Sequence, residues 1–160
     1  MKPGLIAPTL IVLLSSGCQV LSYHEPTEGD LATLTFSSNK TAAQPVICVP
    51  GKGFEPTYLS VSANTSDSQF VSDMNTALNK AATVSVKVDA SRGSAKAGFV
   101  VQQKQSVGPT RRCRVATQFA VMAGHEYTVH LTEADDHCGL SVTEQDAPVE
   151  DAFLTPWDCE

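Results

Sequence analysis

The feature that most constrains the fold is an alternation of apolar and polar residues over short segments. Residues 31–36 place Ala32, Leu34 and Phe36 on one face, and residues 84–88 alternate in the same way. Successive side chains of a β-strand point to opposite faces, so this period is typical of half-buried strands. Further candidate strands, separated by turn residues, lie at 45–49, 58–62, 99–101, 115–121, 127–131 and 140–142.

Several short strands with frequent turn signals indicate an antiparallel sandwich or barrel. We predict an all-β fold, an antiparallel β-sandwich of about seven short strands. The clearest hairpin joins residues 115–121 to residues 127–131 through a turn at 122–126 that contains Gly124.

One segment has a different period. Residues 67–82 carry apolar side chains at intervals of three and four, which predicts one short helix or an irregular covering segment. Asp67 or Ser68 is placed to cap its beginning. The apolar residues are Phe70, Met74, Leu78 and Ala81. We expect this apolar stripe to pack on the sheet.

The N-terminus has the pattern of an export signal. Lys2 precedes an apolar run over residues 5–14, and the small residues Ser16 and Gly17 precede Cys18. A secretory signal needs a basic start, an apolar stretch of roughly 7–15 residues and small residues at the cleavage site. The run is too short to cross a bilayer, which takes about 20 apolar residues.

The cysteine after these small residues resembles the bacterial lipoprotein box, although Ser15 stands where the box normally has leucine. The resemblance implies that the Cys18 thiol receives a diacylglycerol and that the new amino terminus is acylated. Gln19 is not the aspartate that retains lipoproteins in the inner membrane, so the outer membrane, facing the periplasm, is the implied destination. The alternative is an ordinary cleaved signal followed by a chance cysteine.

These observations divide the chain into three parts. We predict a signal peptide at 1–17, a lipidated N-terminus and polar tether at 18–30, and the β-sandwich domain at 31–160. The tether contains proline and glycine, which are typical of loops and turns.

With Cys18 assigned to lipid, four cysteines remain, and an even number in an oxidising compartment indicates two disulfides with three possible connectivities. The predicted hairpin places Cys113 opposite Ala134, at its open end. Cys138 follows Ala134 by four residues, so a disulfide between Cys113 and Cys138 is geometrically easy. Cys48–Cys159 is then the second bridge. If the lipid assignment fails, the cysteine count becomes odd and one thiol is left over.

The formal net charge is −6, which argues against nucleic acid as a partner. The basic residues nevertheless gather between positions 80 and 114, whereas the C-terminal residues are acidic. The two regions could lie near one another or form solvated faces, or the basic region could meet an anionic partner. The candidate surface comprises Lys87, Arg92, Lys96, Lys104, Arg111, Arg112 and Arg114.

The chain carries no nucleophile elbow and no phosphate-binding loop. Residues 133–137 combine acidic side chains with His137, which could offer metal ligands, but acidic loops at strand ends are commonly only solvated. We therefore predict no catalytic residue, no metal and no cofactor.

The mature chain resembles a group of small lipoproteins from proteobacterial envelopes. The residues that carry the resemblance are Cys18, Glu25, Pro26, Thr27, Gly29, Cys113, Phe119, Gly124, Tyr127, Cys138 and Val142. The resemblance implies a lipid-anchored β-domain and adds no catalytic residue.

Together these features predict an outer-membrane lipoprotein that acts as a non-catalytic binding or scaffolding module of the cell envelope. Its expected partners are the membrane, through the lipid, and an unidentified envelope protein or anionic envelope component. The alternative is a protective lipoprotein, either an immunity protein or an inhibitor of an incoming wall-degrading enzyme. Acidic anchored domains suit that role because foreign lysozymes are often cationic.

Overall fold

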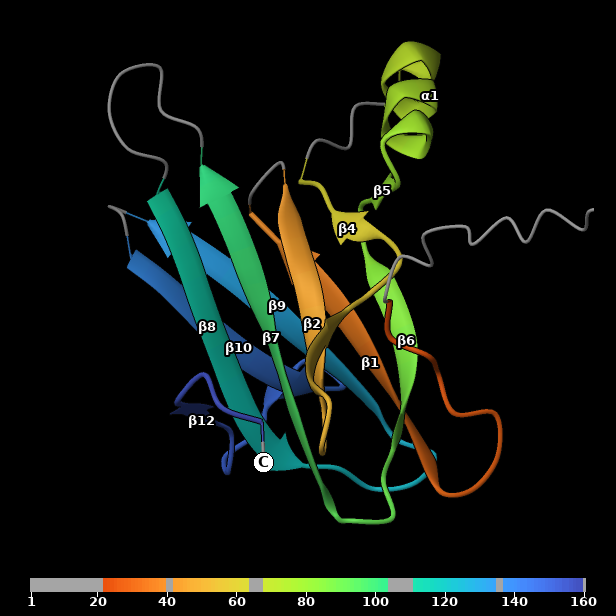
Figure 1. The fold of residues 1–160 in the computed structure, drawn as a ribbon, viewed down its shortest axis with the longest axis vertical. Helices are drawn as coiled ribbons and strands as arrows, with labels where there is room; N and C mark the ends of the chain where they lie inside the picture. The colour runs from red at the N-terminus through yellow and green to blue at the C-terminus, as the bar shows by residue number, and fades with distance from the viewer. Residues whose placement is uncertain (1–21, 40–41, 64–67, 104–110, 135–136, 160) are drawn as a thin grey trace, which may run out of the picture.

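A computed structural model describes residues 22–39, 42–63, 68–103, 111–134 and 137–159. Within these residues two β-sheets enclose one hydrophobic core, and one short helix projects beyond them (Figure 1). Sheet A contains β1 (Leu31–Ser38), β6 (Val84–Asp89), β9 (Glu126–Ala134), β10 (His137–Glu144) and β11 (Ala147–Pro148). Sheet B contains β2 (Ala43–Val49), β3 (Gly53–Pro56), β4 (Ser60–Val61), β5 (Lys80–Ala81), β7 (Ser94–Gln103), β8 (Arg111–Ala120) and β12 (Phe153–Thr155). The helix is α1 (Gln69–Ala77).

The predicted all-β sandwich is confirmed, and the alternation in sequence is the reason for it. The inward residues of β1 and β6 are buried while their neighbours are more exposed. The inner faces of the two sheets meet where the Phe36 ring of sheet A contacts the Phe99 ring of sheet B edge-on, with centroids 5.4 Å apart. Burial of these faces is the main source of stability, at about 25 cal/mol per Å² of apolar surface.

The pairing is not wholly antiparallel. β1 lies between β6 and β9, and it runs antiparallel to β6 but parallel to β9. β4 and β5 are also parallel. The strand expected at 58–62 contracts to β4, and β3 forms a separate hairpin with β2.

The hairpin predicted for residues 115–131 is wrong. β8 pairs with β7 and β12 in sheet B, whereas β9 pairs with β10 and β1 in sheet A. The turn at 122–126 therefore carries the chain from one sheet to the other. Phe119 of β8 and Tyr127 of β9 consequently meet across the core, with ring centroids 5.6 Å apart. Alternation shows which face of a strand points inward. It does not show which sheet the strand joins, because the inner faces of both sheets are apolar.

The cysteines pair as predicted, Cys113 with Cys138 and Cys48 with Cys159. The geometric reason differs for the first pair. Cys113 lies in β8 and Cys138 in β10, so this disulfide joins the two sheets instead of closing the open end of a hairpin. The second disulfide attaches the C-terminal residues to β2.

The helix predicted from the three-and-four spacing is present, but the expected packing of its stripe on the sheet is wrong except at Ala81, which lies in β5 and packs partly against the core. Ser68 occupies its N-cap position, and Asn79 follows it with a φ of 52°, in the left-handed region that commonly ends helices. None of the residues of α1 is buried. Phe70 and Leu78 are 74% and 54% exposed. The chain leaves β4 and returns at β5, so α1 lies outside the two sheets (Figure 1).

The part of the predicted tether that the structure describes is not free. The Tyr23 amide donates to the Pro56 carbonyl at 2.7 Å, and its hydroxyl donates to the Lys87 carbonyl at 2.9 Å. The Lys87 amide in turn donates to the Glu25 carboxylate at 2.8 Å. Residues 22–30 therefore lie along the β-domain. Cys18 and the signal segment lie outside the described residues. The described residues include no helix long and apolar enough to cross a membrane.

Candidate binding site

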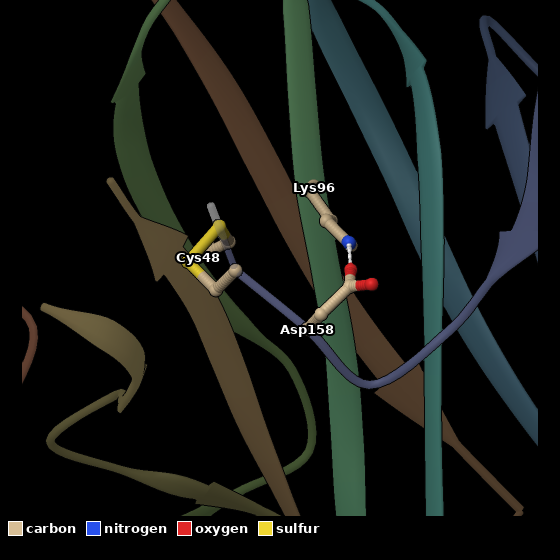
Figure 2. The surroundings of a disulfide bond; sticks show 4 residues. Cys48, Lys96 and Asp158 are labelled. Atoms are coloured by element: carbon tan, nitrogen blue, oxygen red, sulfur yellow. Dashed lines mark hydrogen bonds and ion pairs between the residues drawn. A yellow bond between two sulfur atoms is a disulfide. The ribbon is translucent and has the colours of Figure 1, made fainter. Parts of the chain in front are cut away.

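The outer face of sheet B is shaped by the C-terminal residues, which lie across it. β12 pairs with β8. Further on, Asp158 forms an ion pair with Lys96 of β7, and Cys159 is bonded to Cys48 of β2 (Figure 2). Cys48 and Lys96 point outward because the residues beside them in β2 and β7, Ile47 and Ala97, belong to the core.

This attachment places Trp157 over the sheet. Its indole stacks on the Phe54 ring of β3, with centroids 4.3 Å apart and planes inclined by 26°. The sequence predicted the Cys48–Cys159 disulfide, but nothing in the local pattern paired Trp157 with Phe54. Residues 54 and 157 are brought together by the tail's path across the sheet.

Beside this stack, the outer face of sheet B forms an open groove with a volume of about 620 Å³. Its floor includes Val46 of β2 and Val100 of β7, which share the outward face of sheet B. The residues that define it are Val46, Phe54, Val100, Gln102, Arg114 and Trp157. Clefts of this size, mostly apolar with a few polar groups, are typical of sites for small molecules and peptide segments.

The charge of the groove is positive. Arg114 lies opposite Val100 in the β7–β8 register and is exposed. Arg112 is two residues away on the same face of β8, opposite Gln102. No acidic residue is among those that line the groove, and within the described part of the chain neither guanidinium forms an ion pair. A guanidinium presents a planar fork of donors that fits a carboxylate or phosphate.

A second cavity, of about 600 Å³, lies between the N-terminal segment and the turns of β2–β3 and β6–β7. Its charged groups largely neutralise one another, since Lys96 pairs with Asp158, and Lys52 lies 3.9 Å from Glu55. Burial, followed by the negative charges of Glu25, Asp89 and Glu55, raises the pKa of Tyr23 to about 12.

In the same cavity, the side-chain and then the backbone hydrogen bond from Ser91 lower the pKa of Asp89. The Ser91 amide donates to that carboxylate at 2.8 Å. This interaction closes the β6–β7 turn, so it has a structural explanation that requires no ligand.

The structure divides the predicted basic residues among several places. Lys87 faces outward on β6 of sheet A, whereas Lys96, Arg112 and Arg114 face outward on sheet B, and Arg92 is exposed in the turn between β6 and β7. Lys104 and the side chain of Arg111 lie outside the described residues. Lys96 approaches the acidic tail through its pair with Asp158. Arg112 and Arg114 remain together on one open surface.

The described histidines lie in separate places. His125 Nδ1 is paired with Glu144, and His130 Nδ1 lies 2.8 Å from the Ser37 hydroxyl. His137 is exposed at the beginning of β10, and residues 135–136 beside it lie outside the described part of the chain. Among the described residues there is no group of three or more metal-ligating side chains.

No model of a known protein family matches the chain, and no curated protein matches it.

Proposed function

We propose that the protein is a lipid-anchored envelope protein of the outer membrane, facing the periplasm, whose sandwich binds an anionic partner and performs no chemistry. The observation that carries the proposed binding is the acid-free groove on sheet B, in which Arg114 stands beside the Phe54–Trp157 stack. Among the described residues that line the groove, those other than Arg114 are uncharged, and none is a histidine or cysteine. The arrangement suits recognition of a carboxylate or phosphate next to an apolar group.

The anchor rests on Cys18 and the signal segment before it. Cells expressing the whole chain should incorporate labelled palmitate into the protein, and Cys18→Ser should abolish the label and release the protein from the membrane fraction. Label that persists in Cys18→Ser, or a variant that stays in the membrane fraction, would show that Cys18 is not the anchor.

The groove is tested with paired arginine variants. Arg112→Gln together with Arg114→Gln should lower recovery of the partner from detergent-solubilised envelopes by at least about tenfold, because hydrogen bonds to charged groups contribute about 1.5–3 kcal/mol. Arg92→Gln is the matched control, since Arg92 is exposed but outside this groove. Recovery by the unchanged protein should also fall at high salt. Equal recovery by the double variant and the control would contradict the proposal.

The identity of the recovered protein separates two functions. A resident envelope complex supports the scaffolding role. A secreted wall-degrading hydrolase would instead support a protective role, as an immunity protein or inhibitor.

A further inference from the structure

Helix α1 exposes one apolar side. Phe70, Met74 and Leu78 are 74%, 38% and 54% exposed. They are separated by four residues each, so they share one face of the helix and its C-terminal end. Val71 and Asn75, on another face, are less exposed. Every other residue of α1 is exposed, so the side that carries Phe70 is open to solvent.

A fourth exposed apolar side chain lies at the same end of the molecule. Tyr58 is 70% exposed and immediately precedes the segment that leads into β4. The Ser60 amide of β4 donates to the Asn79 carbonyl at 3.0 Å, which holds the end of α1 against this strand. We call Tyr58, Phe70, Met74 and Leu78 the apolar tip. Figure 1 shows α1 projecting at this end.

The N-terminal segment leads toward the apolar tip. The Ala90 amide donates to the Asp30 carbonyl at 2.7 Å, and Tyr23 contacts Lys87, so the segment follows β6 backward toward its beginning. β6 begins at Val84, shortly after β5 and α1. Ser22 therefore lies nearer than Asp30 to the end of the molecule at which α1 projects. From Ser22 the chain can extend at most about 14 Å to Cys18.

We propose that the apolar tip docks on the lipid bilayer that holds the Cys18 anchor, which orients the domain on the membrane. The inference rests on the anchor of the proposed function. The short connection from Ser22 to Cys18 keeps the domain at the membrane surface, so weak attraction at the tip is enough to orient it. Aromatic and aliphatic side chains enter the boundary between headgroups and acyl chains favourably. Asp73 is the one charged residue within α1, so docking removes little charge from water and the cost of desolvation is small.

The bilayer is a better occupant than a protein partner because the tip is small. Stable protein interfaces bury about 800 Å² per partner, and a nine-residue helix is only about 13 Å long. An anchored domain needs no such area, because the lipid already holds it at the surface.

Depth-dependent quenching tests the docking. The whole protein carries Phe70→Trp in a Trp157→Phe background, which keeps an aromatic ring on Phe54. The matched control carries Ser72→Trp, on the exposed opposite side of α1. The probes are vesicles of phosphatidylethanolamine and phosphatidylglycerol, with and without brominated acyl chains. The emission of the tryptophan at position 70 should shift to the blue, and most of its fluorescence should be lost in brominated vesicles. The tryptophan at position 72 should keep its fluorescence in the same vesicles.

The outcomes separate docking from the anchor. Quenching at position 70 alone supports docking. No quenching at 70 in protein that carries the palmitate label overturns docking and leaves the anchor intact, and a tip covered by a protein would give this result. Quenching at 70 without any label at Cys18 retains docking and overturns the anchor. Absence of both the quenching and the label overturns both proposals.

Discussion

At the scale of single residues, Gly98 shows how closely two strands of sheet B approach. It lies in β7 between Val46 of β2 and Ala116 of β8. A Cβ atom at this position would lie 2.2 Å from the Val115 carbonyl oxygen. That oxygen belongs to the backbone and cannot rotate away, so the strands would have to separate. A glycine inside a strand often marks such an approach.

We expect Gly98→Ala to lower the free energy of unfolding by about 1–3 kcal/mol, the usual cost of inserting a methyl group into a packed site. Gly139→Ala in β10 is the control, because no heavy atom lies within 4 Å of the position that its Cβ atom would take, and its φ is ordinary. Its effect should stay within about 0.5 kcal/mol. Urea unfolding of the oxidised proteins measures both values. Similar losses in the two variants would show that the close approach is not the cause.

At the scale of elements, local pattern predicted α1 but not its surroundings. The three-and-four spacing identifies a helix with one apolar side, and the same spacing is found in a helix packed on a sheet and in one facing a bilayer.

The position of the C-terminal tail depends on distant parts of the chain and not on its local pattern. β12 is short and its residues Phe153 and Leu154 are exposed, so the tail depends on contacts with distant strands.

The disulfide to β2 should be the strongest of these contacts. It closes a loop with a sequence separation of 111 residues, for which the chain-entropy model gives about 5 kcal/mol of stabilisation. Cys48→Ser with Cys159→Ser should lower the free energy of unfolding by up to about this amount. It should also shift Trp157 emission to the red as the indole leaves Phe54.

The pair Cys113→Ser with Cys138→Ser is the control for the tail. It should also destabilise the protein, with a predicted effect of about 3.5 kcal/mol for a sequence separation of 25. It should leave Trp157 emission in the folded state unchanged, because that disulfide joins β8 to β10. A red shift in both pairs would show that the tail is not held locally by Cys159.

At the scale of the whole molecule, connections between the sheets determine the architecture. The turn at 122–126 crosses from sheet B to sheet A, and the Cys113–Cys138 disulfide joins the same two sheets. Tyr23 adds a third connection, since its amide donates to Pro56 of sheet B and its hydroxyl donates to Lys87 of sheet A.

This connection should fail at alkaline pH. The pKa of Tyr23 rises from 10.0 to about 12 in the folded protein, so folding favours the neutral phenol. The resulting stabilisation is complete below about pH 10 and is lost as the pH rises toward about 12. Tyr23→Phe should lower stability near neutral pH by about 0.5–1.5 kcal/mol, through loss of the hydrogen bond.

Thermal unfolding of wild type and Tyr23→Phe across this range measures the effect. The variant should lose less additional stability than wild type between about pH 10 and 12. Tyr58→Phe is the control because its ring is exposed, and it should follow the wild-type pH dependence. An identical alkaline loss in Tyr23→Phe and wild type would contradict the assignment.

Local patterns in the amino-acid sequence were sufficient to predict most of the strands, the inward faces of β1 and β6 and the existence of α1. The cysteine pairing was also predicted correctly, but from a hairpin that the structure does not contain. These features depend on neighbours along the chain or on a few countable residues. Three features required the folded chain: which sheet each strand joins, the parallel pairing of β1 with β9, and the groove that Phe54, Arg114 and Trp157 share. The physical reason is that alternation fixes which side of a strand is apolar, while both sheets offer equivalent apolar inner faces. The choice of partner strand, and with it the surface opposite the core, depends on contacts between residues far apart in sequence.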